Sequence, residues 1–384
     1  MTATRPLPPP PPPAVVKALE EAGVPIEHYA DACRACDACD EDVDPYPKGF
    51  EQDMDSEMLG GIQAFGRQVL VSTGKSDWPH DISEDQQGLP YLIQSAYEDL
   101  NKADSGSGGS GLLGKLTGKL FGGGGGGKAA AAALPGVYPS SAAPPPDVEV
   151  SSRLSILASS FISSSHSPTH HSTIILPDYK IVHEVSPSRS DAEDLAKRYL
   201  LPSVGRAGAP AQGEVSEKKM QSWPLPYHAV VLLCSHKKRD KRCHISAPLL
   251  ISQFHHHLSS HGFHIDERGD GHDLTSHGPP IEDWEGTTEE KEERLRETLQ
   301  EVGREGEATV GVFKVSHLGG HKFAGNVIIY FPNGSVVWYG RASPADVKLI
   351  VDRTIVHGQV IPELLRGGLG LEGKKGGERG VLEW

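Results

Sequence analysis

Two long low-complexity segments limit how much of this chain can form a packed core. Residues 1–44 begin with a proline run and end in an acidic stretch, and residues 104–146 contain runs of glycine, alanine and proline. Because such segments offer few apolar side chains for burial, they do not offset the conformational entropy that ordering would cost. We therefore predict a disordered tail over residues 1–44 and a disordered insertion over residues 104–146.

The remaining segments predict an α/β (α+β) fold with two domains. Strand-like and helix-like segments alternate within residues 45–205 and indicate a small N-terminal α/β domain, for which a thioredoxin-like fold is one option. Residues 206–224, rich in glycine, alanine and proline, predict a linker. In residues 225–365 the order strand, helix, helix, strand, strand, helix is that of a thioredoxin-like unit, with Pro248 in the first turn of its first helix. The glycine-rich residues 366–384 predict a flexible C-terminal tail.

The charge of the chain and its N-terminal sequence restrict the class of protein. Lys and Arg number 37 against 51 Asp and Glu, a net charge of −14, which argues against general binding of nucleic acid. No apolar run reaches the roughly 18–20 residues of a membrane span. The first residues resemble neither a secretory signal nor a mitochondrial presequence. We therefore predict a soluble, cytoplasmic protein that binds neither nucleic acid nor a membrane.

Two cysteines and two histidines form the strongest candidate site. Cys234 ends a predicted strand and Cys243 follows it after eight residues, whereas His317 and His321 form an H-x-x-x-H motif directly after another strand. Because both pairs leave the same ends of adjacent strands, we expect thiolates and imidazoles to converge, as in zinc and iron–sulfur sites. Structural zinc sites usually space their cysteines by two to four residues, so the longer gap favours a two-iron cluster.

The segment between the two cysteines is strongly basic. It contains five cationic side chains and one acid, Asp240. Their positive field would stabilise an anionic thiolate or a reduced cluster. The five are Lys237, Lys238, Arg239, Lys241 and Arg242.

These motifs resemble the fungal sucrase/ferredoxin-like family. The similar segments are CSHKKRDKRCHISAPL, HLGGHKFAGNVIIYFPNG and VVWYGR in the second half, and CDEDVDPYP, DMDSEMLG, QVLVSTGKSDWPHDI and LPDYKIVHEV in the first. The resemblance implies a thioredoxin-like ferredoxin domain that holds a [2Fe–2S] cluster and acts in one-electron transfer or redox sensing. The ligands that it implies are Cys234, Cys243, His317 and His321.

Other functions remain open at this point. A zinc-stabilised interaction module would use the same four residues, and a thiol oxidoreductase would use Cys234 and Cys243 as a disulfide pair. A hydrolase is not indicated, because the chain contains no G-x-S-x-G nucleophile elbow. The motif Cys33-x-x-Cys36-x-x-Cys39 lacks the fourth cysteine and the following proline of a bacterial cluster motif. It indicates incidental or weak metal binding, and a second redox site is the alternative.

The last three residues form a separate candidate site for a protein partner. Leu382-Glu383-Trp384 resembles the C-terminal signal by which the cytosolic assembly machinery recognises iron–sulfur clients. A tryptophan on a flexible tether supplies a large apolar anchor beside a free carboxylate, which suits capture in a pocket. We therefore predict that these residues dock the cytosolic iron–sulfur assembly and targeting machinery, while the redox partner is left unidentified.

Overall fold

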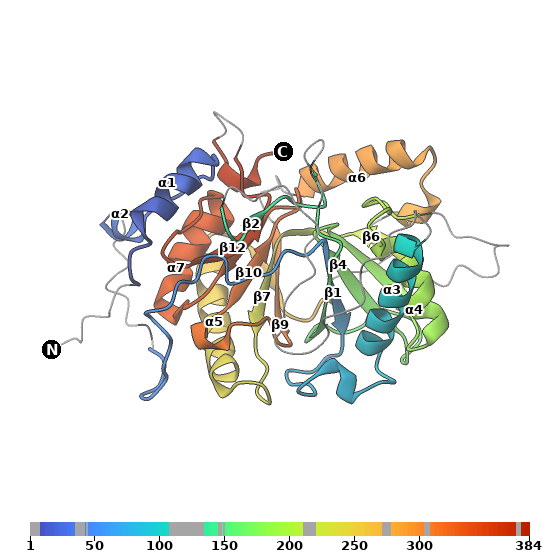
Figure 1. The fold of residues 1–384 in the computed structure, drawn as a ribbon, viewed down its shortest axis with the longest axis horizontal. Coiled ribbons are helices and arrows are strands. Elements are labelled where there is room, and N and C mark those ends of the chain that lie inside the picture. Colours follow the sequence, from blue (N-terminus) through green and yellow to red (C-terminus); the bar gives the residue numbers. More distant parts are fainter. Residues whose placement is uncertain are drawn as a thin grey trace.

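A computed structural model describes residues 8–34, 43, 45–106, 134–144, 148, 150–209, 220–270, 278–302, 308–373 and 378–384. In this part of the chain the strands form one mixed sheet of twelve, in the order β2-β12-β11-β10-β7-β9-β3-β1-β4-β5-β6, with β8 beside β9. Helices cover the sheet on two sides (Figure 1). The predicted α/β class is therefore confirmed.

The C-terminal half begins with a parallel pair of strands. Strand β7 pairs in parallel with β9, and the helix α5 connects them. Strand β10 lies antiparallel to β7 on its other side, followed by β11 and β12. The bounds are β7 (Tyr227–Cys234), α5 (Lys241–Ser260), β8 (His264–Asp266), α6 (Thr288–Val302), β9 (Thr309–Val315), β10 (Val327–Tyr330), β11 (Val336–Tyr339), α7 (Val347–Leu349) and β12 (Leu365–Leu369).

The N-terminal half repeats this order. Strand β1 pairs in parallel with β3 through the helix α3, β4 lies antiparallel to β1, and β5 and β6 follow as antiparallel neighbours. One residue pair, Ser159 with Val315, joins β3 to β9 and makes the two halves one sheet. The bounds are β1 (Arg67–Ser72), α3 (Leu89–Gly106), β3 (Leu154–Ser159), β4 (His171–Leu176), β5 (Lys180–Val185), α4 (Arg189–Leu195) and β6 (Gln221–Pro224).

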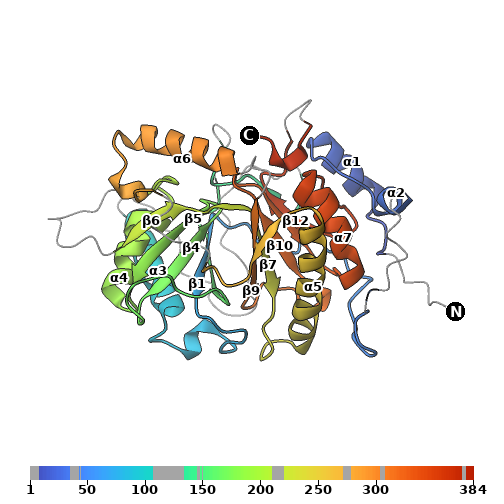
Figure 2. The same cartoon turned by 180° about the vertical axis from the view of Figure 1, so that it is seen from behind.

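Alternation along the strands divides the interior into three cores. In β7, Val231 and Leu233 pack with α5 and α7, whereas Leu232 and Cys234 face a central core between the two halves. In β1, Leu70 faces the same central core, and its neighbours pack against α3 and α4. Successive side chains of a strand point to opposite faces, so a strand buried on both faces reads as a continuous apolar run. The outer layers are α5 with α7 on one side and α3 with α4 on the other (Figure 2).

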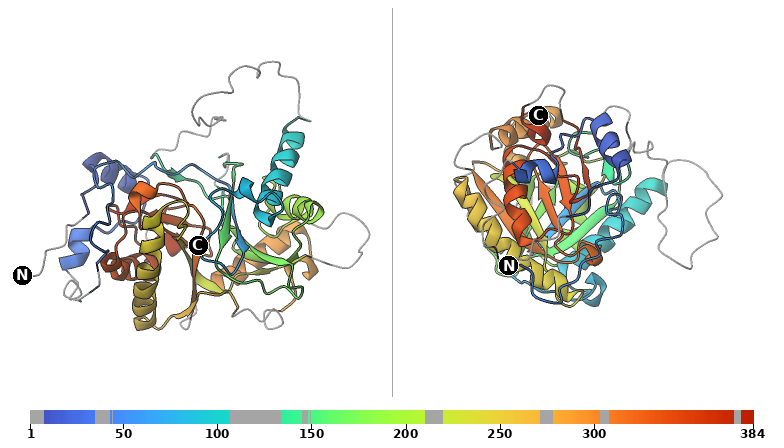
Figure 3. Two further views of the ribbon diagram at one scale, coloured as in Figure 1. Left: turned by 90° about the horizontal axis from the view of Figure 1, so that it is seen from below. Right: turned by 90° about the vertical axis from the view of Figure 1, so that its left-hand side faces the viewer.

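Several segments of low complexity or linker composition carry ordered structure. Helices α1 (Pro13–Glu21) and α2 (Tyr29–Arg34) lie within the predicted tail, and they pack on the C-terminal half, where Leu19 is fully buried (Figure 3). Strand β2 (Val137–Tyr138) lies within the predicted insertion and pairs with β12. Strand β6 lies within the predicted linker, and β12 lies within the predicted tail except for its first residue, Leu365. Edge strands form through backbone hydrogen bonds, which composition does not reveal.

Other predictions fall outside the described residues. Most of the predicted insertion, residues 107–133, is not among them, nor are the side chains of Cys33, Cys36 and Cys39. Among the helices that are described, none is both long and apolar enough to cross a membrane.

Candidate functional site

The end of β7 and the first turn of α5 bring Cys234 and Cys243 together. The structure starts α5 at Lys241, seven residues before the predicted start at Pro248. The reason is Asp240, whose carboxylate accepts the backbone N–H of Arg242 at 2.8 Å and caps the helix. Both cysteines are free thiols, and 3% of Cys234 and 1% of Cys243 is exposed. The cap therefore places Cys243 on a rigid element beside the end of the strand.

The two cysteines interact directly, and this contact shifts their pKa values in opposite directions. The Cys243 S–H donates to Cys234 and lowers the pKa of Cys234 well below its ordinary value, against the effect of burial. The His317 side chain and the backbone N–H of Leu318 also hydrogen-bond to Cys234. The donated hydrogen bond and burial raise the pKa of Cys243 in turn. A thiolate is the form of cysteine that binds metals, so one ligand is already prepared.

The histidine pair lies in the loop that follows β9. Gly319 and Gly320 have positive φ angles of 80° and 65°, a conformation that glycine adopts without strain. This turn stacks the His317 and His321 rings with centroids 4.3 Å apart and planes 20° apart. The backbone N–H of Gly319 donates to His317 Nδ1 at 3.3 Å. The glycines therefore bring two imidazoles together, one of which contacts Cys234.

His321 carries a ring nitrogen without a partner. Its Nδ1 atom is buried and forms no hydrogen bond to any residue that the structure describes. Burial and the nearby His317 lower the pKa of His321, which keeps the ring neutral. A neutral imidazole with an unused nitrogen is the form in which histidine binds metals. Nevertheless, no group of three or more His, Cys, Asp and Glu side chains within the described ranges is arranged to hold a single metal ion.

A loop of the N-terminal half supports the segment between the two cysteines. The Trp78 carbonyl lies 3.0 Å from His236 Nε2, and the two rings form an edge contact. The Lys238 N–H donates to the Asp77 carboxylate at 3.3 Å, and Arg239 donates to the His80 carbonyl at 3.1 Å. The loops after β1 and β7 lie at the same edge of the sheet (Figure 1). Trp78 and His236 lie 158 positions apart, so no local sequence pattern predicts this contact.

Sequence reasoning missed Arg366, which lies beside the histidine loop. Its guanidinium donates to the carbonyl of Gly319 at 3.3 Å and to the carbonyl of Gly61 at 3.0 Å. The residue belongs to the segment that was predicted as a flexible tail, yet only 1% of it is exposed. The sequence offers one weak signal, the apolar pair Leu364-Leu365 directly before it.

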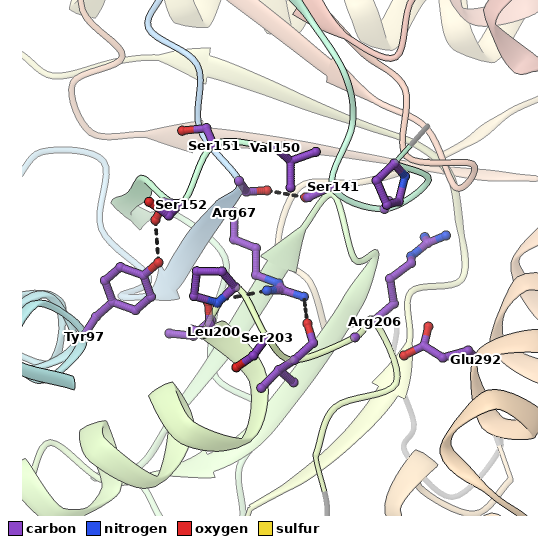
Figure 4. A pocket seen from close by; sticks show the side chains of 16 residues that line it. Arg67, Tyr97, Ser141, Val150, Ser151, Ser152, Leu200, Ser203, Arg206 and Glu292 are labelled. Carbon is purple, nitrogen blue, oxygen red and sulfur yellow. Dashed lines mark hydrogen bonds between the residues drawn. The ribbon is translucent and has the colours of Figure 1, made fainter. Parts of the chain in front are cut away.

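A separate cavity of about 300 Å³ lies in the N-terminal half and includes none of the predicted site residues. Arg67 enters it, but the guanidinium already donates to the Asp178 carboxylate and to the carbonyls of Leu201 and Val204 (Figure 4). Its donors are therefore used within the protein. The cavity carries no chemistry comparable with that of the cysteine–histidine site.

The C-terminal tripeptide lies at the opposite edge of the sheet from the cysteine loop (Figure 1). Leu382 is buried, and Trp384 packs half-buried against the central core. Asn333 Nδ2 donates to the carbonyls of Val381 and Glu383 at 2.7 and 2.8 Å. The tripeptide is thus packed on the protein in this structure and does not contact the cysteine–histidine site.

Fold and site together define a mixed α/β protein whose candidate centre consists of two cysteines and two histidines. A family model described as sucrase/ferredoxin-like matches residues 58–367, and the chain belongs to this family. The resemblance found in the sequence is therefore confirmed. No solved structure is similar to the chain.

Curated relatives come from fungi. The chain is 28% identical to altered inheritance of mitochondria protein 32 of Clavispora lusitaniae over 221 residues, which are 55% of this chain and 63% of that protein. It is 30% identical to the protein of the same name from Meyerozyma guilliermondii, over 52% of this chain and 57% of the relative. It is 34% identical to actin patches distal protein 1 of Saccharomyces cerevisiae, over 33% of this chain and 30% of the relative. The chain thus spans less than two thirds of these relatives.

Proposed function

We propose that this protein holds a [2Fe–2S] cluster and acts in one-electron transfer or redox sensing. The ligands are Cys234, Cys243, His317 and His321, and the C-terminal half is a thioredoxin-like ferredoxin domain. The observation that carries the proposal is the buried contact between Cys234 and Cys243, in which Cys234 also contacts one of two stacked imidazoles. Two thiolates with two imidazoles are the ligand chemistry of one class of [2Fe–2S] centre.

The donor set fits such a cluster better than it fits a single metal ion. A two-iron cluster takes two protein ligands on each iron, so it needs two pairs of donors and not one group of three. The unused Nδ1 of His321 and the thiolate of Cys234 are one donor from each pair. A proton shared by the two cysteines leaves when a metal binds, because only the thiolate is a ligand.

The charge of the four ligands determines how readily the site would take up an electron. When bound, the cluster supplies a couple that takes one electron from a donor, such as a reduced flavin or a second iron–sulfur centre, and passes it to a one-electron acceptor. Two neutral imidazoles in place of two thiolates remove two negative charges from the site. The protein therefore opposes electron uptake less than a four-cysteine site would.

Analysis of iron and acid-labile sulfide in anaerobically purified protein tests the proposal. We expect equal amounts of iron and sulfide and visible absorption that bleaches on reduction. Zinc without sulfide would support the interaction module instead. A metal-free protein with a reversible Cys234–Cys243 disulfide would support the thiol oxidoreductase, although the 3% exposure of Cys234 leaves a partner thiol little access.

For partners, we propose that Leu382, Glu383 and Trp384 dock the cytosolic iron–sulfur assembly machinery and that the protein acts in the cytoplasm. Because Leu382 is buried, capture of all three side chains requires this segment to detach from the core. Trp384→Ala should then lower iron occupancy in protein made in its native cytosol and leave the reduction potential of the filled fraction unchanged. Full occupancy when the targeting factors are limiting would contradict this proposal.

A further inference from the structure

Arg366 is a buried cation without a carboxylate partner. It is 1% exposed, and its hydrogen bonds go to the Gly319 and Gly61 carbonyls and to the Asn326 side-chain oxygen, all neutral acceptors. Its Nε atom has no partner among the described residues, and no acidic side chain in that part of the chain pairs with the guanidinium. A buried charge of this kind is strongly unfavourable unless an anion balances it.

Arg366 lies against the loop that carries the two histidines. Its guanidinium donates to the Gly319 carbonyl, between His317 and His321, and to Asn326 Oδ1, and the Asn326 carbonyl accepts from the Cys234 backbone N–H at 3.4 Å. Burial lowers the pKa of Arg366 to about 10, so the guanidinium keeps its charge at neutral pH. The guanidinium also stacks on the rings of Phe323 and Trp338, with centroids 5.4 and 5.2 Å away. These rings and the contacts to the backbone hold the charge against the histidine loop and away from water.

Two glycines make this position possible. A Cβ atom added to Gly320 would lie 2.4 Å from Arg366 Nη2, and one added to Gly340 would lie 2.6 Å from Arg366 Cδ. The backbone at Gly320 and at Gly340 therefore leaves room for the guanidinium and for the aliphatic part of the Arg366 side chain. The histidine loop approaches the guanidinium as closely as a backbone without a side chain allows.

We propose that Arg366 is the fixed positive charge that raises the reduction potential of the cluster held by the cysteine–histidine site. This inference rests on the proposed function. Electron uptake adds one negative charge at the site, and a nearby buried cation stabilises that charge far more than a surface lysine does, because the surroundings screen it little. Arg366 acts through the electrostatic field and is not itself a ligand.

The test is a redox titration of Arg366→Gln, in which mediators at an electrode supply the electron. We expect the ratio of oxidised to reduced protein at a fixed potential to rise by at least about tenfold, which corresponds to about 59 mV for one electron. Arg366→Lys keeps the charge and should stay within about threefold of the wild type, less than half of that shift on the logarithmic scale. If the lysine and glutamine variants shift equally, the guanidinium acts through its shape and the proposal is wrong.

A second variant neutralises the charge and keeps the arginine. Asn326→Asp places a carboxylate at the atom that already accepts from Arg366, so the potential should fall as it does in Arg366→Gln. The control is Arg341→Gln, because Arg341 also stacks on Phe323 but its charge is balanced by Asp53, 3.9 Å away. The control should leave the potential unchanged.

Iron content separates the remaining outcomes. If Arg366→Gln and Asn326→Asp lose iron while Arg366→Lys retains it, the charge is required to hold the centre, which supports the proposal. If Arg366→Lys loses iron as well, the proposal fails. An unshifted potential in cluster-bearing variants contradicts the role of Arg366 alone, whereas wild-type protein without iron and sulfide contradicts the proposed function itself.

Discussion

The two halves of the molecule share an order of strands and helices and differ in what they carry at the strand ends. Cys234 is the last residue of β7, and Ser72 is the last residue of β1, its counterpart. The second residue after β9 is His317, whereas the second residue after β3 is the buried Phe161. The repeated backbone presents two equivalent loops, and only the side chains decide that one of them has ligand chemistry.

The charges in the two halves are balanced differently. In the N-terminal half, Asp178 accepts from Arg67 at 2.9 Å and lies 3.5 Å from Lys180 Nζ, so buried cations meet a buried carboxylate. In the C-terminal half, the acceptors that Arg366 contacts among the described residues are neutral oxygens. The buried cations of the N-terminal half are balanced within the protein, whereas the charge of Arg366 is left to balance an anionic centre such as the one proposed above.

Replacement of matched strand-end residues gives the largest expected contrast. Cys234→Ser should lose nearly all bound iron and sulfide, because a neutral hydroxyl does not replace a thiolate on iron. Ser72→Ala, at the same place in the other half, should keep its iron and lose only the hydrogen bond that Ser72 accepts from Ser172 N–H at 2.9 Å. Equal iron loss in both variants would contradict the idea that only the C-terminal half provides metal ligands at its strand end.

Replacement of Trp78, which contacts His236 across the two halves, tests whether the N-terminal half supports the cysteine–histidine site. Trp78 is 5% exposed, so Trp78→Ala should lower the free energy of unfolding by about 3–5 kcal/mol. It should also lower the iron that the protein retains on dilution, because His236 loses its edge contact with the Trp78 ring.

Trp78→Phe is the matched control for this contact. It keeps a ring at His236 and loses the Nε1–H bond to Thr73 Oγ1 at 2.9 Å, which should change stability by about 1 kcal/mol. Urea unfolding and iron analysis measure both effects. If Trp78→Ala is destabilised and retains iron as the wild type does, the N-terminal half stabilises the fold without supporting the cysteine loop.

The buried cations should differ in their pH dependence. Burial lowers the pKa of Lys180 from 10.5 to about 8, so between these values the unfolded chain binds more protons than the folded one. Stability from this residue therefore increases as pH rises through this window, and below about pH 8 the buried ammonium destabilises the fold in full. Between pH 7 and 10 the wild type should therefore gain up to about 3 kcal/mol of unfolding free energy relative to Lys180→Met.

Arg366 provides the comparison for that titration. Its pKa is lowered only to about 10, so it keeps its charge through most of the same range. The difference between wild type and Arg366→Gln should therefore stay flat from pH 7 to 9 when urea unfolding is measured on metal-free protein. A slope as steep as that of Lys180→Met would contradict the distinction between the two cations.

The sequence by itself determined the α/β class, the family and the four residues of the candidate site. These follow from local patterns, because a buried strand ends at Cys234 and a glycine turn follows β9 whatever the rest of the chain does. Only the tertiary structure brought Arg366 to the thiols, set Trp78 against His236 and added β2 to the edge at β12. Those contacts join residues more than 100 positions apart, and their stability comes from burial and backbone pairing that short patterns do not encode.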